Sequence, residues 1–153
     1  MRRELLPQEH ARHRAVLDLV AAKSGWKNAR PKDEMWGLAL HESFNSVVAQ
    51  VAQLKRTANG LKLQKVICAV DCGLAVNPNI VAMQMESGIG YGLAAALTGA
   101  ITLKDGKVEQ SNFDDYPVLR MNQMPAIDVH IVPSTAKPIW RSEERRVGKE
   151  CRS

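Results

Sequence analysis

The sequence has few aromatic residues, few cysteines and no long apolar run, and each shortage excludes a class of protein. Aromatic residues make up 5% of the chain and apolar residues 45%, which favours a core built from aliphatic faces of helices and strands. Three cysteines are too few and too irregularly spaced for a disulfide framework. No segment reaches the run of about eighteen apolar residues that a spanning helix needs, and the polar N-terminus lacks the apolar centre of a signal peptide. The length of 153 residues fits one ordinary domain.

The net charge of +5 does not point to a nucleic-acid interface. Residues 141–153 alone hold five basic and three acidic side chains, and elsewhere lysine and arginine are scattered among acids. No basic stripe interleaved with aromatic residues is present, so we interpret the charge as a property of solubility. Weak nucleic-acid binding stays an alternative, and it requires an affinity that falls steeply with salt.

Two short patterns resemble metal sites only superficially. Cys68 and Cys72 have no second cysteine pair and no nearby histidine, so we expect free thiols beside a strand end rather than a zinc site. His41-Glu42 lacks the second histidine of a helical zinc motif and lies on an expected strand, where a loop or strand-edge role is the simpler interpretation. We therefore expect no metal ligated by these side chains.

Motifs for acid–base, nucleophilic or phosphate chemistry are weak or missing. Asp114 and Asp115 are adjacent, and adjacent residues of an extended chain point to opposite faces, which favours a solvated or capping role over paired catalysis. The chain has neither a phosphate-binding GxxxxGK[ST] loop nor a GxSxG nucleophile turn. The residues alone give no catalytic candidate.

In the first half of the chain, the apolar pattern predicts a helix followed by a long hairpin. Apolar residues recur at helical spacing over residues 8–24, and Gly25 is a natural stop. From Met35 a loosely alternating apolar segment predicts a strand that runs to a turn at residues 57–60 and returns as a second strand to Asp71.

In the second half, capping residues define a long helix. Asn77 is a good N-cap, Pro78 suits the first helical position, and the helix should run to about Thr98. A short hairpin turning at Asp105-Gly106 and a strand over residues 127–132 follow. The expected fold class is α+β, with helices packed on antiparallel hairpins.

The predicted helix over residues 78–98 is unusual because it contains three glycines. Gly88, Gly90 and Gly92 should each cost about 0.5–1 kcal/mol relative to alanine in mid-helix. Gly88, Gly92 and Ala96 lie at i, i+4 and i+8, so one face has almost no side chains and invites close approach. The approaching group is either another element of the protein or a bulky ligand that Gln84 would hydrogen-bond. Packing is the simpler interpretation on these residues alone.

The segment CAVDCGLAVNPNIVAMQMESGIGYGLAAAL, followed by SNFDDYPVLRMN, resembles the molybdopterin-binding large subunit of the xanthine dehydrogenase and aldehyde oxidase family. The likeness is particular to the β subunit of isoquinoline 1-oxidoreductase and its bacterial relatives, and it covers nearly all of residues 2–134. The joint pattern VDCG-x3-NP-x5-QME-x-G is specific. Gln84 stands where the family has the glutamine that contacts the pterin, and Gly88 lies one turn further on, while Ser87 replaces a common glycine.

The resemblance implies an oxidoreductase that hydroxylates N-heterocycles or aldehydes with oxygen from water. The implied cofactor is a molybdenum-molybdopterin in its cytosine dinucleotide form, bound by a domain fragment over residues 1–138. The implied partner is a small iron–sulfur subunit that removes the electrons. The resemblance leaves the location of the protein open between the cytoplasm and the periplasm of a bacterium. The other class is a non-enzymatic α+β interaction module that docks a partner through the glycine-faced helix.

The end of the chain departs from the family pattern. The family continues after IVPS into a GVGEP-like segment with the catalytic glutamate, whereas Glu143, Glu144 and Glu150 lie in no such context, so none is assigned that role. Residues 141–153, RSEERRVGKECRS, reproduce the in-frame translation of a common sequencing adapter. We therefore expect residues 139–153 to be a non-native tail on an inactive C-terminal fragment. Genomic DNA beyond Lys137 should then encode a GVGEP-like motif, and finding the tail there would contradict this.

Overall fold

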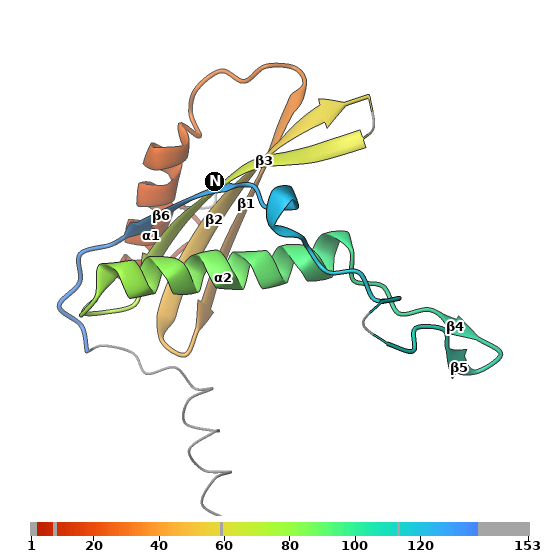
Figure 1. The fold of residues 1–153 in the computed structure, drawn as a ribbon. Helices are drawn as coiled ribbons and strands as arrows, with labels where there is room; N and C mark the ends of the chain where they lie inside the picture. Colours follow the sequence, from red (N-terminus) through yellow and green to blue (C-terminus); the bar gives the residue numbers. More distant parts are fainter. Residues whose placement is uncertain (1–2, 8, 59, 113, 138–153) are drawn as a thin grey trace, which may run out of the picture.

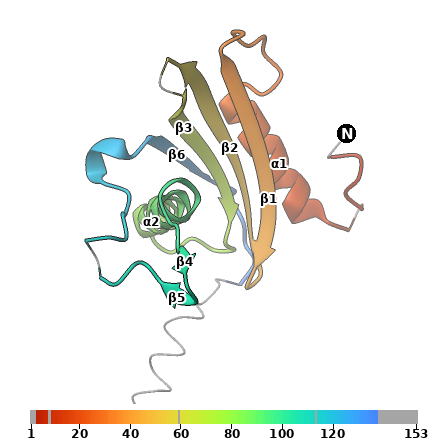
Figure 2. The ribbon, with the colours of Figure 1, turned by 90° about the vertical axis from the view of Figure 1, so that its right-hand side faces the viewer.

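A four-stranded sheet with one helix on each face forms the centre of the structure, a computed structural model that describes residues 3–7, 9–58, 60–112 and 114–137. Figure 1 shows α2 crossing one face, and Figure 2 shows α1 on the opposite side. The proposed tail over residues 139–153 lies outside the described residues. In chain order the elements are α1 (Ala11–Ser24), β1 (Glu34–Ser43), β2 (Ser46–Thr57), β3 (Gly60–Asp71), α2 (Pro78–Leu97), β4 (Leu103–Lys104), β5 (Lys107–Val108), a 3-10 turn (Met121–Gln123) and β6 (Ala126–Ile131).

The first predicted strand is wrong in extent, because the chain reverses within it. Phe44 and Asn45 both have positive φ, 49° and 63°, and they form a tight turn between β1 and β2. Two antiparallel strands replace the single one, and β3 then returns along β2 as predicted. The turn contains no glycine, so nothing in the sequence indicates it. Asparagine tolerates positive φ, whereas phenylalanine adopts it only at a cost in free energy.

The fourth strand of the sheet is parallel, which the hairpin pattern did not predict. The sheet order is β1-β2-β3-β6, and β6 pairs with β3 in parallel register from Lys65 opposite Ala126 to Val70 opposite Ile131. A parallel pair needs a crossover connection, and α2 supplies it on one face of the sheet. The α+β class is confirmed, with β6 added as a parallel edge to an antiparallel meander.

Each face of the sheet has its own apolar core. On the α1 side, Val16 and Val20 pack against alternate residues of β2 and β3. On the α2 side, Ile89 packs against Val66 and Cys68, and half-buried side chains of α2 and β6 extend this cluster. Alternation along β3 explains both cores, because successive side chains point to opposite faces.

The expected helix ends and the second hairpin are confirmed. Gly25 ends α1 with a φ of 67°, and its N–H bonds the last turn. Asp105 and Gly106, with φ of 50° and 75°, turn the chain between β4 and β5. None of the helices within the described ranges combines the length and apolarity required to span a bilayer.

Candidate functional site

The start of α2 is fixed by its capping residues. The Asn77 side-chain oxygen accepts hydrogen bonds from the backbone N–H groups of Asn79 and Ile80, at 3.1 and 3.2 Å. Pro78 follows at the first helical position, where a backbone N–H would have had no partner inside the helix. The helix therefore begins at one defined residue, and the faces of its later turns are set from there.

The open face of α2 lies beside the side that packs on the sheet. Ile89, Met85 and Leu93 face the sheet core. A β-carbon built on Gly88 or Gly92 would meet no atom within 4 Å. At 100° per residue these glycines, with the exposed Ala96, form one stripe, which we call the glycine stripe. No other described residue packs on it, so the packing interpretation of Gly88 and Gly92 has no partner within that part of the chain.

Gly90 differs from the two open glycines. A β-carbon there would lie 3.3 Å from Cε of Met124 and 3.5 Å from its sulfur. Met124 belongs to the segment that returns from α2 to β6, so Gly90 lets that segment approach the helix. The sequence placed Gly88 and Gly92 on one face and left Gly90 off it, and the structure shows that this face is open while Gly90 packs against Met124.

Gln84 lies one helical turn before Gly88 on the same flank. Its side chain is half-buried, and it makes no hydrogen bond to any other residue in the described ranges. A primary amide has two N–H donors and an oxygen acceptor, and those of Gln84 remain accessible to water or to a ligand. The flank therefore combines an open backbone surface with unused hydrogen-bonding groups.

An apolar hollow lies on the opposite flank of α2. It has a volume of about 590 Å³ and is bounded by the helix and by the segment around Val118. Met83 and Tyr91 are exposed at its rim, at 64% and 79% of their surfaces, and Glu86 is a carboxylate in its lining. The hollow is on a different flank from the glycine stripe, so the two surfaces are separate.

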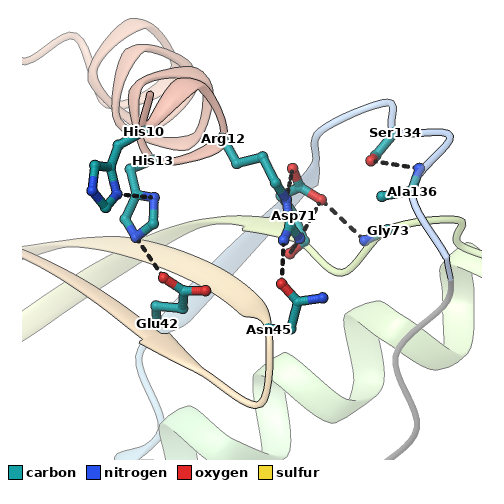
Figure 3. A network of polar contacts seen from close by, with 9 residues as sticks. All are labelled: His10, Arg12, His13, Glu42, Asn45, Asp71, Gly73, Ser134 and Ala136. Atoms are coloured by element: carbon teal, nitrogen blue, oxygen red, sulfur yellow. Dashed lines mark hydrogen bonds and ion pairs between the residues drawn. The ribbon is translucent and has the colours of Figure 1, made fainter. Parts of the chain in front are cut away.

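An ion pair with a buried carboxylate lies where β3 leads into the loop before α2 (Figure 3). The Arg12 guanidinium, on the first turn of α1, donates from Nε and Nη2 to the two oxygens of Asp71, at 2.9 and 3.0 Å. Nη1 donates to the side-chain oxygen of Asn45 at 2.9 Å, and the Asp71 carboxylate also accepts from the backbone N–H of Gly73 at 3.0 Å. We call these four residues the Asp71 network.

Electrostatics keeps both members of this pair charged. The Asp71 side chain is 4% exposed. The Arg12 guanidinium nevertheless lowers the pKa of its carboxyl, and the Gly73 N–H adds to this against the opposing effect of burial. Asp71 in turn raises the pKa of Arg12. Sequence reasoning missed this pair, whose members are 59 positions apart; the one available signal was an aspartate ending a buried apolar strand.

A histidine pair extends the polar surface beside this network. His13 Nε2 lies 3.0 Å from a Glu42 carboxylate oxygen, and the Nδ1 atoms of His10 and His13 are 3.4 Å apart. Figure 3 shows Glu42 reaching this pair from the edge strand β1. The expected edge role of His41-Glu42 is therefore confirmed for Glu42, which ties β1 to α1.

The other sequence candidates have structural roles. Cys68 is a free, buried thiol, and burial raises its pKa to about 11. Cys72 is free and half-buried. The Asp115 carboxylate accepts from the backbone N–H groups of Ser111 and Asn112, the predicted capping role, and these bonds lower its pKa.

Within the described ranges, no group of three or more histidine, cysteine or acidic side chains could hold a metal ion. Glu143, Glu144 and Glu150 lie outside the described residues.

Comparison with known sequences gives a consistent set of relatives. Residues 12–125 match the protein family described as the molybdopterin cofactor-binding domain. The isoquinoline 1-oxidoreductase subunit beta of Brevundimonas diminuta is 42% identical over 124 residues, which cover 77% of this chain and 16% of that protein. The membrane-bound aldehyde dehydrogenase [pyrroloquinoline-quinone] of Gluconacetobacter polyoxogenes is 30% identical over 140 residues, covering 86% of this chain and 18% of that protein. The chain thus spans under a fifth of the length of these relatives.

Solved structures share the fold. The Cu,Mo-CO dehydrogenase in its carbon monoxide reduced state superposes with a TM-score of 0.53 at 22% identity, over 61% of this chain and 12% of that chain. Quinoline 2-oxidoreductase from Pseudomonas putida 86 gives a TM-score of 0.50 at 20% identity, over 61% and 13% of the two chains. At these identities the likeness establishes the arrangement of helices and sheet.

Proposed function

The chain belongs to the molybdopterin cofactor-binding domain family, and from this premise we propose that α2 contacts the cofactor through Gln84 and Gly88. The supporting observation is the open flank of α2, where a β-carbon on Gly88 would meet nothing within 4 Å. A pterin is large, flat and rich in hydrogen-bonding groups, so it can approach a helix backbone only where side chains are absent. Gln84 offers both donors and an acceptor at the same flank.

The described residues fit this group as a binding surface and supply no group that we assign to the chemistry. The two open glycines leave room, and the Gln84 amide has no other partner among the described residues. When bound, the molybdenum centre supplies the two-electron redox chemistry, with water as the source of oxygen. Gln84 holds and orients the pterin from one side, and the isolated chain has no hydroxylase activity.

The parent protein we propose is a molybdenum hydroxylase large subunit acting on N-heterocycles or aldehydes. Its relatives are named for isoquinoline, nicotinate and nicotine among the heterocycles and for an aldehyde, which suggests this substrate range. The cofactor is proposed in its cytosine dinucleotide form, with an iron–sulfur subunit as the electron-accepting partner. The relative named for pyrroloquinoline quinone makes the identity of the cofactor the first point to measure.

Cofactor content of the purified parent protein tests the proposal. Molybdenum per polypeptide and the fluorescence of the oxidised pterin are measured for wild type, Gln84→Ala and Gly88→Leu. Ala22→Leu is the matched control, because it places the same leucine side chain at an exposed position of α1. Gln84→Ala should weaken the affinity for the cofactor about tenfold, as expected for one lost hydrogen bond to a bound group, and so lower the molybdenum content, and Gly88→Leu should abolish it. Wild-type content in both variants, or a quinone in place of molybdenum, would overturn the proposal.

The second function, a module that docks a protein partner through α2, is favoured by the apolar hollow beside Met83 and Tyr91. Binding of the iron–sulfur subunit to cofactor-free and cofactor-loaded parent separates the two. A docking module binds equally in both states and loses binding with Tyr91→Ala. A cofactor-binding helix shows the content changes above, and Tyr91→Ala leaves them unchanged.

A further inference from the structure

The Asp71 network joins four segments at the point where the sheet meets α2. Arg12 lies on α1, Asn45 lies in the turn between β1 and β2, Asp71 ends β3, and Gly73 begins the loop that leads to α2. Arg12 also donates to the backbone carbonyl of Asp71 at 3.1 Å. In Figure 3 the guanidinium lies between Asp71 and Asn45, with Gly73 on the far side of the carboxylate. One buried carboxylate therefore receives hydrogen bonds from a helix and from the loop at once.

A second contact holds the same loop against the chain that follows β6. The N–H of Leu74 donates to the carbonyl of Ala136 at 2.9 Å. Gly73 has a φ of 73°, and a β-carbon there would lie 2.3 Å from the carbonyl oxygen of Lys137. The backbone of residues 136–137 thus occupies the space that a side chain at position 73 would need. Residues 72–77 are held from both sides immediately before the helix begins.

Anchoring this loop fixes where α2 begins. The N-cap Asn77 comes four residues after Gly73, and the helix then runs as one rigid element to Gln84 and Gly88. Because the helix is rigid and turns a fixed 100° per residue, a displacement or rotation of its first turn moves Gln84 and Gly88 by the same amount. The orientation of the glycine stripe relative to the sheet therefore depends on how firmly the loop is held.

We propose that Arg12 and Asp71 are positioning residues that set the cofactor-facing flank of α2 by anchoring the loop over residues 72–77. The proposal rests on the function proposed above. It requires the planar guanidinium, because one group must bond both carboxylate oxygens, the Asn45 oxygen and the Asp71 carbonyl together. Lysine keeps the charge and cannot make this set of contacts.

The experiment separates positioning from stability. The double variant Arg12→Met/Asp71→Leu replaces the buried pair by apolar groups, a change that is often neutral for stability, while it leaves the Gly73 N–H without its acceptor. Arg12→Lys keeps the charge and removes the fork. Asp128→Asn is the matched control, because the ion pair of Lys65 with Asp128 also joins two elements of the fold but is exposed and distant in sequence from the loop. Melting temperature and amide hydrogen exchange are measured on the chain, and molybdenum content on the parent protein.

We expect the loop over residues 72–77 and the first turn of α2 to lose their fixed position while the chain stays folded. Exchange at Gly73, Leu74 and the first turn of α2 should become about tenfold faster in the double variant and in Arg12→Lys, as lost hydrogen bonds to a charged group imply. The melting temperature should fall by only the few degrees that one N–H without its acceptor costs, and molybdenum content should fall by at least half. Asp128→Asn should change none of these.

Molybdenum content that stays at the wild-type level while exchange at the loop rises would overturn the proposal, as would unchanged exchange in both variants. If the double variant fails to fold, Arg12→Lys tests the proposal by itself, through amide exchange at the loop and molybdenum content. Failure of the proposed function is recognised separately: Gly88→Leu then keeps full molybdenum content, or wild type holds none. Exchange at the loop, measured without cofactor, still reports whether the network anchors it.

Discussion

Substituting Gly88 by alanine should stabilise the chain although the glycine is proposed to serve binding. Glycine in mid-helix costs about 0.5–1 kcal/mol relative to alanine, because more backbone freedom is lost on folding. The added β-carbon meets no atom within 4 Å, so no steric cost offsets the gain. For a chain of 153 residues, 1 kcal/mol corresponds to about 2–4 °C, so the melting temperature should rise by about 1–4 °C.

Thermal and urea unfolding followed by circular dichroism measure this effect, with Gly90→Ala as the matched control. The new β-carbon at position 90 would lie 3.3 Å from Met124 Cε, so the neighbouring thioether must shift and the gain should be smaller. A melting temperature lowered by Gly88→Ala would refute the reasoning, since it would mean that the stripe is packed within the chain itself. Stabilisation accompanied by weaker cofactor retention is the combination that a binding surface predicts.

Three further predictions concern an ion pair, a strained glycine and a stacked arginine. The pKa of Asp71 is lowered from 3.8, so the stability that its carboxylate contributes is present above about pH 4 and is lost as pH falls through the lowered pKa. In urea titrations, the free energy of unfolding of Asp71→Asn should therefore fall less steeply with decreasing pH than that of wild type. An unchanged dependence on pH would contradict this. Gly73→Ala should cost at least about 1–2 kcal/mol, because φ is 73° and the β-carbon would overlap the Lys137 carbonyl; stability equal to wild type by urea unfolding would exclude that strain. Arg30→Ala should lower the free energy of unfolding by about 1 kcal/mol and shift tryptophan fluorescence, since the guanidinium carbon lies 4.3 and 4.6 Å from the ring centroids of Trp26 and Trp36. Identical spectra and unfolding midpoints would show that the stacking contributes nothing.

Features with a local cause could be predicted from the sequence. Gly25, Asn77 and Pro78 each act within one helical turn, so the end of α1 and the start of α2 followed from residue type alone. The Asp105-Gly106 turn is of the same kind. The reversal at Phe44 was missed because its residue type disfavours the backbone angle it adopts, and tertiary pairing of β1 with β2 overrides that preference.

Features that depend on distant contacts could not be predicted. The parallel pairing of β6 with β3 leaves no local mark, because an alternating strand reads the same whichever neighbour it joins. The pairing of Arg12 with Asp71 joins positions 59 residues apart, and nothing near Arg12 distinguishes it from other helical arginines. For the proposed site the sequence located the helix and the face that holds Gly88 and Gly92, while only the structure shows that no other described residue covers these two glycines.

The difference between Gly90 and the two open glycines bears on which ligand α2 serves. Met124 accounts for Gly90, whereas the cost of about 0.5–1 kcal/mol each at Gly88 and Gly92 has no compensating contact among the described residues. Local costs without a structural gain are expected where a chain binds something. A protein partner docking on an apolar surface would use the hollow around Tyr91 and would leave the Gln84 amide without partners. A ligand with donors and acceptors would use the open backbone and the amide together, and the position of Gln84 beside Gly88 therefore favours the cofactor over a docking protein.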